Sequence, residues 1–410
     1  MTPGWYRALD ANARRAFWST YVGFSIDAMN IQLYSFILPV LLIVWGLTAP
    51  SAGLLASAAL ISSAIGGWIA AGLSDRLGRV RILRVTIVWL AISTMLCGLA
   101  HNYDQLLAAR LIQGLAFGAE WGVGSVFMGE IASPRTRGRL LGTALSAWAL
   151  GWGLAAAVST LAIALLPLEA GWRVTFLVSL PAAAAVLLLR MRLSESPTFL
   201  ASRSAEPWHG IFAAGMRGKT MRGCLLAMGT HGGYWAIATW WPAMLRLERR
   251  MSSAEISAHM AALVGGALCG YLVGAWLNDR VGRRATLATF ATVGIAIVLA
   301  VTRLPLSNGA LLACSLLVGL PAAGLYSAIG PVLTELYPTG LRGSGLGFCY
   351  NVGRGIAGFT PLAIGGSVAT FGIAGSIGIY VAGAYSVVLL AAALLTETRA
   401  LDFAVARESA

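Results

Sequence analysis

Charged side chains are scarce in this chain. Only 11% of its 410 residues are Asp, Glu, Lys or Arg, whereas 58% are hydrophobic. A soluble domain carries roughly 25% charged residues. So much apolar sequence exceeds what one water-soluble core buries. The composition therefore excludes an ordinary soluble globular protein and predicts an integral membrane protein.

The sequence also lacks the local patterns of several enzyme and cofactor classes. It contains no Walker phosphate-binding loop, which argues against ATP as a driving force. Its five cysteines lie singly in apolar segments, without a CxxC pair or histidines at metal-ligand spacing, so we expect no metal. Gly353–Gly358 matches GxGxxG, but no strand precedes it. With no nucleophile and base pattern visible, we expect no enzyme activity and no cofactor.

Lysine is almost absent, since all of the 29 basic residues except Lys219 are arginines, and the formal net charge is +13. The arginines form no continuous stripe, so we expect no nucleic-acid partner. Most of them fall in short gaps between apolar runs, which is typical of the positive-inside pattern of membrane proteins.

Long apolar runs are plentiful. A membrane-crossing helix needs about 20 predominantly apolar residues. We therefore predict an all-α membrane protein with twelve transmembrane helices, at residues 17–45, 52–73, 82–101, 105–131, 139–166, 172–191, 220–245, 256–277, 285–303, 307–336, 344–367 and 371–396.

The basic residues also orient the chain. If the N-terminus lies inside, 22 of the 29 basic residues fall at cytoplasmic segments, six fall at outer segments, and Arg354 lies within a span. The positive-inside rule favours this arrangement. We expect a multi-pass protein of the cell (inner) membrane with both termini in the cytoplasm.

Two short motifs occur twice at nearly the same separation. Asp75–Arg79 returns as Asp279–Arg283, 204 positions later. Glu130, followed seven positions on by Arg-Gly, returns as Glu335 with its own Arg-Gly, 205 positions later. An offset of half the chain indicates an internal duplication. We predict two pseudo-symmetric six-helix halves, residues 1–192 and 220–410, joined by a cytoplasmic linker at 193–219.

The repeated motifs place acids and arginines at the cytoplasmic ends of helices, and Gly78 and Gly282 permit tight turns there. We interpret these charges as a breakable network, here called the gate, that closes the cytoplasmic side in one state. The alternative is that they only anchor the topology. The predicted gate residues are Asp75, Arg76, Gly78, Arg79, Glu130, Arg137, Asp279, Arg280, Gly282, Arg283, Glu335 and Arg342.

The repeated loops resemble the signature of the major facilitator superfamily, G-x-x-x-D-R-x-G-R-[RK]. The first copy fits from Ala71 to Arg79, although Val80 replaces the usual basic residue, and the second fits through Arg284. The resemblance covers essentially the whole chain. It implies a secondary transporter with a central cavity and alternating access.

Further motifs are similar to particular branches. The Glu-x6-Arg-Gly pattern and Ser194–Pro197 resemble the branch of sugar porters, organic-ion carriers and aromatic-acid:proton symporters. Three segments resemble sialate- and monocarboxylate:proton symporters: Gly23–Asn30, Arg110–Gly114 and Gly118–Gly122. These likenesses imply an organic acid as substrate and a proton as co-substrate.

Two acids lie inside expected spans. Asp27 and Glu120 are near the middle of their helices, where a charge costs several kcal/mol and usually serves function. We expect proton coupling at these two residues; the alternative is a structural ion pair. The resemblance also shows a departure: relatives with a D-[GA]-x-D pattern carry a second acid where this chain has Asn30, which cannot titrate. A proton-independent facilitator therefore stays open.

Two arginines also lie inside expected spans. Arg354 is near the middle of its span, where a guanidinium needs a carboxylate from the protein or from a ligand. Arg110 is a second candidate, although its side chain could extend outward instead. Two cations at one cavity predict an organic anion as substrate.

Weaker candidates complete the expected substrate site. The resemblance implies that the seventh span, at 220–245, lines the cavity, and its aromatic side chains offer flat contact area. We expect Trp240 and Trp241 to lie at the membrane interface instead. The full set of predicted substrate-binding residues is Arg354, Arg110, Asn30, Gln32, Tyr34, Gln113, His231, Tyr234, Trp235, Tyr350 and Asn351.

The combined prediction is a secondary active transporter for proton-coupled uptake of a small organic anion: a carboxylate, a sialate-like compound or an aromatic acid. Its expected partners are this anion, a proton and the lipid bilayer, and we expect a monomer. Two alternatives remain: a proton-independent facilitator or exchanger of the same fold, and a membrane sensor that binds without transport.

Overall fold

The computed structural model describes residues 6, 9–131, 143–196, 208–338 and 341–397. The described residues are helical with short connections. The first half contains α2 (Ala11–Val44), α3 (Ala49–Leu77), α4 (Arg79–Leu99), α5 (Tyr103–Ile131), α7 (Ala147–Leu165), α8 (Leu168–Leu177) and α9 (Leu180–Met191). The second contains η1 (Trp208–Phe212), α11 (Arg217–Leu247), α12 (Ser253–Arg280), α13 (Arg283–Arg303), α14 (Asn308–Glu335), α15 (Arg342–Ala357) and α16 (Thr360–Leu394).

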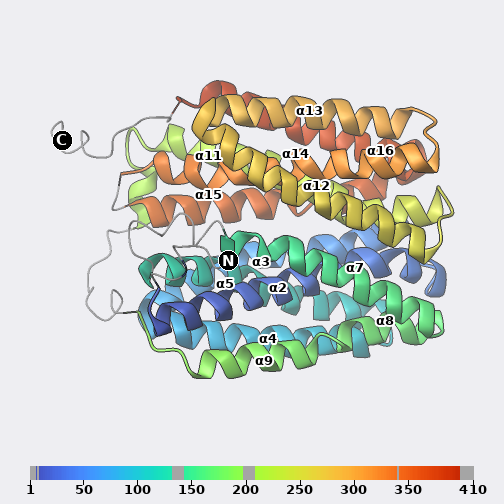
Figure 1. Cartoon of the computed structure of the whole chain (residues 1–410), viewed down its shortest axis with the longest axis horizontal. Helices are drawn as coiled ribbons and strands as arrows, with labels where there is room; N and C mark the ends of the chain where they lie inside the picture. Colours follow the sequence, from blue (N-terminus) through green and yellow to red (C-terminus); the bar gives the residue numbers. More distant parts are fainter. Residues whose placement is uncertain (1–5, 7–8, 132–142, 197–207, 339–340, 398–410) are drawn as a thin grey trace.

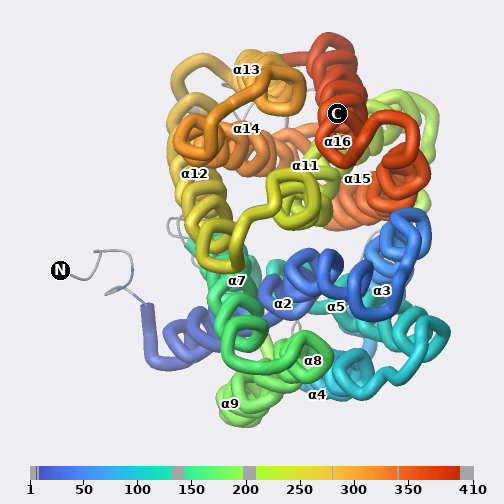
Figure 2. The backbone as a smooth tube through the Cα atoms, turned by 90° about the vertical axis from the view of Figure 1, so that its right-hand side faces the viewer, coloured from blue at the N-terminus to red at the C-terminus, as the bar shows by residue number. Residues whose placement is uncertain are grey.

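The helices form two bundles that lie side by side (Figure 1). A view along the helices shows α2 to α9 in one bundle and α11 to α16 in the other (Figure 2). Helix α2 begins, and helix α16 ends, at the same end of the molecule, which we call the terminal end; the opposite end is the far end. This arrangement agrees with the two halves expected from the sequence.

Helix length and composition fit a membrane. Within the described residues, nine helical stretches are long and apolar enough to cross one. One of these, Arg342–Leu394, contains two of the expected spans. Helices α5 and α11 have 29 and 31 residues, long enough to span, but carry more polar side chains.

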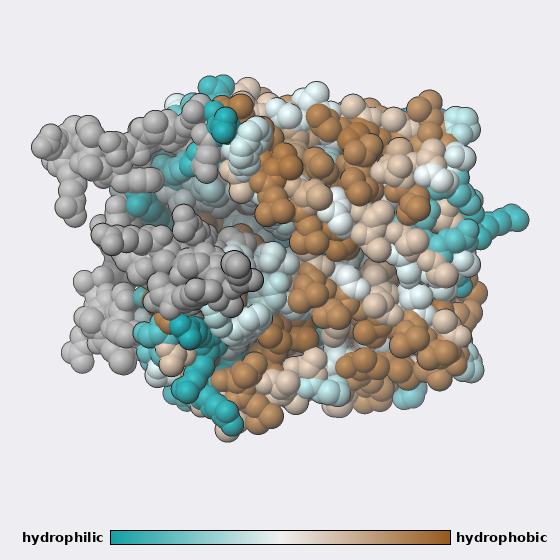
Figure 3. All heavy atoms as spheres, in the orientation of Figure 1, coloured by the Kyte–Doolittle hydropathy of each residue, from teal (hydrophilic) through white to brown (hydrophobic). Residues whose placement is uncertain are grey.

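Apolar side chains also cover the outer surface. Leu272 is 74% exposed and Leu165 is 71% exposed. Figure 3 shows apolar residues across the middle of one face and polar residues toward its two ends. Such a belt is stable only against lipid, because a soluble protein rarely exposes so large an apolar patch.

Two expected spans are divided: the one at 172–191, and the one at 344–367, which passes from α15 to α16 at Gly358 and Phe359. The span at 172–191 divides into α8 and α9, because Pro181 lacks the N–H that would continue the helix. Helix α16 bends sharply at Gly372, whose φ is +70°. There Glu248 accepts hydrogen bonds from the backbone N–H groups of Ile373 (2.5 Å) and Ala374 (3.1 Å), capping the helix that follows. This bend separates the last two expected spans.

The duplicated loops fold alike. Gly78 and Gly282 have φ of +100° and +98°, a conformation that residues with a Cβ rarely adopt. The carboxylate of Glu195 accepts hydrogen bonds from the first N–H groups of α4, at 2.9 Å from Arg79 and 2.8 Å from Val80. This carboxylate therefore caps the helix and complements its dipole.

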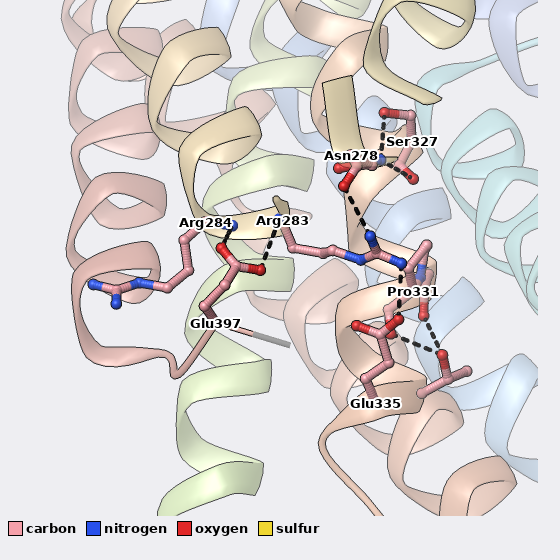
Figure 4. A network of polar contacts seen from close by, with 9 residues as sticks. Asn278, Arg283, Arg284, Ser327, Pro331, Glu335 and Glu397 are labelled. Carbon is pink, nitrogen blue, oxygen red and sulfur yellow. Dashed lines mark hydrogen bonds and ion pairs between the residues drawn. The ribbon is translucent and has the colours of Figure 1, made fainter. Parts of the chain in front are cut away.

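The second half repeats this cap. Glu397 accepts from the N–H groups of Arg283 (3.0 Å) and Arg284 (3.1 Å) at the start of α13 (Figure 4). In both halves the capping acid follows the last span of that half. Each cap therefore ties the last span of a half to its third span.

The two halves meet closely toward the far end. A Cβ placed on Gly53 would lie 2.4 Å from the carbonyl oxygen of Pro361, and one on Gly365 would lie 2.4 Å from that of Ala49. The backbones of α3 and α16 therefore touch directly, as small residues allow in membrane bundles. The Leu362 N–H also donates to Ser57 Oγ at 3.0 Å. We call this contact the far-end seal.

One interfacial expectation was wrong. Trp240 and Trp241 are fully buried, and the Trp240 indole N–H donates to the carbonyl oxygen of Pro361 at 3.1 Å. Both side chains pack inside the protein because α11 lies on the side of the second bundle that faces the first bundle, against α2.

Candidate functional site

A cavity lies between the two halves. Its walls extend from the middle of the helices to the last turn of α14 and the first turns of α15, so it reaches toward the terminal end. It is lined by Phe24, Phe117, Trp121, Leu145, Trp148, His231, Tyr234, Trp235, Tyr271, Tyr326, Ile329, Gly330, Leu333, Leu346, Tyr350 and Arg354. Of the predicted substrate residues, five line it: Arg354, His231, Tyr234, Trp235 and Tyr350.

Arg354 supplies the positive charge of the cavity and is only 2% exposed. One nitrogen of its guanidinium, Nη2, donates to the Ser63 carbonyl oxygen (3.0 Å) and to Asn351 Oδ1 (2.7 Å). Its Nε has no hydrogen-bond partner among the described residues, and no carboxylate of that part of the chain lies within ion-pair distance. The guanidinium therefore has no ion-pair partner among the described residues, and its Nε is able to donate to a carboxylate.

The predicted residue Asn351 acts on the cavity indirectly. Its Oδ1 accepts from Arg354 while its Nδ2 donates to the Gly347 carbonyl oxygen at 2.9 Å. This hydrogen bond fixes the amide, so Asn351 holds Arg354 in place from within α15.

Aromatic rings form most of the remaining wall. Trp121 on α5 and Tyr350 on α15 stack with ring centroids 4.1 Å apart and 12° between their planes. The Arg354 guanidinium carbon lies 5.2 Å from the Phe117 ring centroid and 5.6 Å from that of Tyr350, within range of cation–π attraction. Flat rings beside one cation suit a flat anionic ligand.

Tyr234 offers a polar group on the opposite wall. Its hydroxyl oxygen accepts from the Trp148 indole N–H at 2.6 Å and from Gln32 Nε2 at 3.3 Å. Both bonds use the oxygen as acceptor, so the hydroxyl hydrogen remains available to a ligand. Gln32 therefore positions Tyr234 and does not itself line the cavity.

His231 has one ring nitrogen committed and one available. Its Nδ1 lies 2.8 Å from the Ala227 carbonyl oxygen, and since a carbonyl only accepts, Nδ1 carries the hydrogen. Its Nε2 is buried without a partner in the described part of the protein. The ring packs edge-on against Tyr350 and Tyr326. Nε2 is thus a second point at which a ligand could hydrogen-bond.

Asp27 and Asn30 are buried in α2 behind the cavity wall, with exposed fractions of 1% and 0%. Asp27 Oδ1 and both amide atoms of Asn30 lack hydrogen-bond partners among residues the structure describes. Leaving buried polar atoms unpaired costs about 1–3 kcal/mol each, so such groups usually mark a functional site.

Three other predicted substrate residues lie away from the cavity. Arg110 donates to Gln113 Oε1 (2.6 Å) and to the Leu55 carbonyl oxygen (3.3 Å) inside the first half. The Tyr34 ring centroid lies 4.7 Å from the Arg110 guanidinium carbon, and its hydroxyl donates to the Ala52 carbonyl oxygen. In this state these groups hold α2, α3 and α5 together.

Glu120 forms an ion pair, the alternative that the sequence left open, with a partner that the sequence did not indicate. Both of its oxygens bind the guanidinium of Arg190 on α9, with 2.9 Å between Glu120 Oε2 and Arg190 Nη1. Each side chain is 1% exposed. The charge count includes Arg190 with the cytoplasmic flank of the linker; Arg190 lies in the last turn of α9, and its side chain folds back into the bundle.

The predicted gate residues of the first half gather at the terminal end. Arg79 pairs with Asp75 at 2.9 Å and with Glu130 at 3.0 Å. Gly78 supplies the turn between α3 and α4, and Arg76 occupies the last turn of α3, next to it. Arg137 lies outside the described residues.

The second half repeats the arrangement. Arg283 pairs with Glu335 at 3.1 Å and also donates to the Asn278 carbonyl oxygen at 2.8 Å (Figure 4). Arg342 begins α15 and donates to the Tyr337 carbonyl oxygen, and Arg280 packs over Trp276. The side chain of Asp279 lies outside the described part. These ion pairs join elements of the same half.

Several cavity residues were not singled out from the sequence as binding residues. Phe24, Phe117, Trp121, Trp148, Tyr271 and Tyr326 all line the cavity. Trp121 stands beside small residues in α5, where a bulky ring among glycines is a signal that sequence reasoning could have used. Phe24 and the others lie in uniformly apolar helices, where composition does not separate cavity rings from core rings.

Family models match both halves of the chain. Residues 4–207 match the model described as "Sugar (and other) transporter", and residues 223–407 match the model described as "Major Facilitator Superfamily".

Three bacterial proteins are similar over most of their length. The probable 4-methylmuconolactone transporter of Cupriavidus pinatubonensis is 37% identical over 97% of this chain and 94% of its own. The cis,cis-muconate transport protein of Acinetobacter baylyi is 28% identical over 85% of this chain and 86% of its own. The niacin transporter NiaP of the same organism is 27% identical over 82% and 83%.

Solved structures share the fold. A D-xylose–proton symporter superposes with a TM-score of 0.76 at 19% identity, over 95% of this chain and 98% of its own. The inward-open xylose transporter XylE from E. coli gives 0.77 at 18% identity, over 95% and 97%. At this identity the likeness concerns the arrangement of helices alone.

Proposed function

The chain belongs to the major facilitator superfamily of membrane transporters, and we propose that it carries a small, flat organic anion into the cell together with a proton. Membership confirms the identification made from the repeated loops, as well as the fold of twelve spans in two halves. The chain is a multi-pass membrane transporter and not an enzyme.

The proposal of a negatively charged substrate rests on Arg354. It is buried in the cavity between the halves, and no carboxylate of the described residues is within ion-pair distance. A ligand carboxylate on Nε would supply the missing counter-ion and form a charge-assisted hydrogen bond. The bond joins ligand and protein in a water-poor place, where it is strongest.

The walls support a flat, unsaturated substrate. A planar ligand beside the Trp121 and Tyr350 rings keeps the contact area that those rings offer. The named substrates of the relatives are 4-methylmuconolactone, cis,cis-muconate and niacin. Each is a small unsaturated acid, so the relatives and the cavity favour the same class of compound.

Asp27 is the proposed proton carrier. It is buried on α2 in the first half, whereas Arg354 lies on α15 in the second half. Asp27 Oδ1 lacks a hydrogen-bond partner in the described region. A carboxyl group in a membrane interior is stable when protonated and costly when ionised, so it releases its proton only when exposed to water. Alternating exposure to the two sides would therefore carry one proton with each anion.

The charge count supports a cytoplasmic terminal end, and the cavity extends toward that end. We therefore interpret the structure as the inward-facing state, closed on the outside by the far-end seal. The ion pairs of the gate hold together the cytoplasmic ends of the spans within each half. On opening outward, the halves would rock around the cavity.

Transport by purified protein in liposomes tests the proposal. The liposomes would be acidified outside and offered radiolabelled 4-methylmuconolactone, cis,cis-muconate or nicotinate. We expect one of the three to accumulate and the accumulation to vanish when an ionophore collapses the pH gradient. Uptake that is insensitive to the gradient would instead identify a facilitator, the alternative that Asn30 keeps open.

Counterflow separates a transporter from a sensor. Liposomes loaded with unlabelled compound should take up labelled compound in exchange, without any gradient. Binding without exchange would identify a sensor.

A further inference from the structure

The Glu120–Arg190 ion pair is buried, although Arg190 lies close to the end of its helix. Arg190 is near the terminal end of α9, two residues before Arg192 ends the helix, and its side chain could extend to water. Instead it donates to the Leu83 carbonyl oxygen at 2.5 Å and binds Glu120, which also accepts from Thr86 Oγ1 at 3.0 Å. Desolvating two charges is costly, so stability alone does not account for the pair.

Gly23 on α2 faces this ion pair directly. A Cβ at Gly23 would lie 2.3 Å from Arg190 Nη2 and 2.8 Å from Glu120 Oε1. Any other residue there would displace one of the two charged groups. Because Gly23 has no side chain, the ion pair lies directly against the backbone of α2.

Asp27 lies one turn further along the same face of α2. Residues four apart in a helix are neighbours, and Cα–Cβ bonds tilt toward the helix N-terminus. The Asp27 side chain therefore starts from the face of α2 that meets the ion pair and tilts toward Gly23.

Asp27 and Arg190 each have one polar atom without a hydrogen-bond partner among the described residues, an acceptor on Asp27 and a donor on Arg190. Both atoms, Asp27 Oδ1 and Arg190 Nε, are buried. The titratable or charged groups that act electrostatically on Asp27 are Glu120 on α5, Arg190 on α9, and Arg354 and Tyr350 on α15. The two acids, Arg190 and, from the second half, Arg354 thus form one charge cluster.

We propose that Arg190 is a counter-ion shared by Glu120 and Asp27, a positioning residue that makes the two acids one proton-binding site beside Gly23. This inference rests on the proposed proton coupling. Two carboxylates beside one guanidinium leave one excess negative charge, which a single proton neutralises.

The site has two arrangements. With the proton on Asp27, Arg190 pairs with Glu120, as observed. When the O–H bond of Asp27 breaks and the proton leaves for water, the carboxylate takes Arg190 Nε, and the guanidinium bridges both acids. The reverse steps load the proton from the other side. Arg190 therefore lowers the cost of the deprotonated state without leaving Glu120.

The decisive variant replaces both partners, Glu120→Gln with Arg190→Gln. Two amides keep hydrogen-bonding groups in place and leave no buried unpaired charge, which protects the fold. We expect this double variant to exchange labelled 4-methylmuconolactone by counterflow as the wild type does. We also expect it to lose accumulation driven by a pH gradient, because Asp27 then lacks its counter-ion. Accumulation equal to that of the wild type would overturn the inference and assign the pair a structural role.

A second variant guards against misfolding. Arg190→Lys keeps a positive charge for Glu120, but a lysine lacks the planar fork that presents separate nitrogen atoms to two carboxylates. We expect exchange to persist and accumulation to fall, with its pH profile altered; an unchanged profile would count against a shared counter-ion. The matched control is Glu169→Gln with Arg173→Gln, an ion pair of the same half on α8, away from the cavity. It should behave as the wild type.

The same assay separates the two levels of the argument. If the wild type exchanges 4-methylmuconolactone but does not accumulate it under a pH gradient, proton coupling fails and this inference fails with it. If the wild type accumulates it and both Arg190 variants do as well, only the inference fails.

Discussion

Trp121 and Tyr350 stack face to face across the boundary between the two halves, with 4.1 Å between their ring centroids. One ring belongs to α5 and the other to α15, so the stack exists only while the halves keep their present separation. A ligand that lies against these rings would therefore contact both halves at once. Binding and the relative position of the halves are coupled through this pair.

Trp121→Ala should weaken substrate binding by about two- to tenfold, since an aromatic contact contributes about 0.5–1.5 kcal/mol beyond its area. Trp121→Phe should retain most of the affinity because it keeps a ring. The concentration for half-maximal exchange in liposomes measures the effect. Trp276→Ala is the control, since Trp276 is 56% exposed on the outer surface. Equal effects at both positions would show that Trp121 does not contact the substrate.

Arg354→Gln should weaken binding of anions by about tenfold to a hundredfold, because a hydrogen bond to a charged group contributes about 1.5–3 kcal/mol. Arg354→Lys should lose part of the affinity, since a lysine cannot reproduce the planar fork. Binding of the labelled acid to purified protein in detergent gives the affinity directly. An unchanged affinity in Arg354→Gln would assign Arg354 to the packing of α15 against α3.

Arg110→Gln should lower stability and leave substrate affinity intact. Its guanidinium binds Gln113 and the Leu55 carbonyl oxygen within the first half, and its loss would cost about 1–3 kcal/mol. The midpoint of thermal unfolding in detergent and the affinity for the labelled acid would be measured on the same preparation. A weakened affinity at normal stability would return Arg110 to the substrate site, as the sequence suggested.

Gly78→Ala and Gly282→Ala should each destabilise the protein by about 1–3 kcal/mol, because their backbone conformation is nearly confined to glycine. The new methyl groups would also press on the carboxylates of Glu195 and Glu397. Thermal unfolding is the measurement. Gly72→Ala is the control, since a Cβ there meets no atom within 4 Å. A similar loss in Gly72→Ala would rule out backbone strain as the cause.

The sequence predicted the fold well because two independent signals agreed. The apolar runs indicated the spans, and the repeated motifs indicated the division into two halves. The predicted boundary between the last two spans, near residue 370, lies at Gly372 in the structure. The caps by Glu195 and Glu397 were not predicted. They follow the last span of each half at an offset of 202 positions, close to that of the gate motifs, so the repeat does contain the signal.

The site was harder to predict because contacts across a membrane bundle leave little trace in sequence. Arg354 stands out as a charge inside a span, and the structure places it at the cavity. Arg190 sits at the end of its helix among other arginines, so counting cannot separate it from surface charge. Only the packing of α9 against α4 and α2 turns it inward and brings it to Glu120.

The far-end seal has a consequence for how the two states are balanced. Its contact surfaces at Gly53 and Gly365 are backbone against backbone. Parting such surfaces moves no charge at these two positions, so this step is indifferent to voltage and to salt. The strength of the far-end seal depends on how closely the backbones of α3 and α16 pack. A larger side chain at Gly53 or Gly365 would push the backbones of α3 and α16 apart. If the structure is the inward-facing state, we expect such a substitution to favour the outward-facing state.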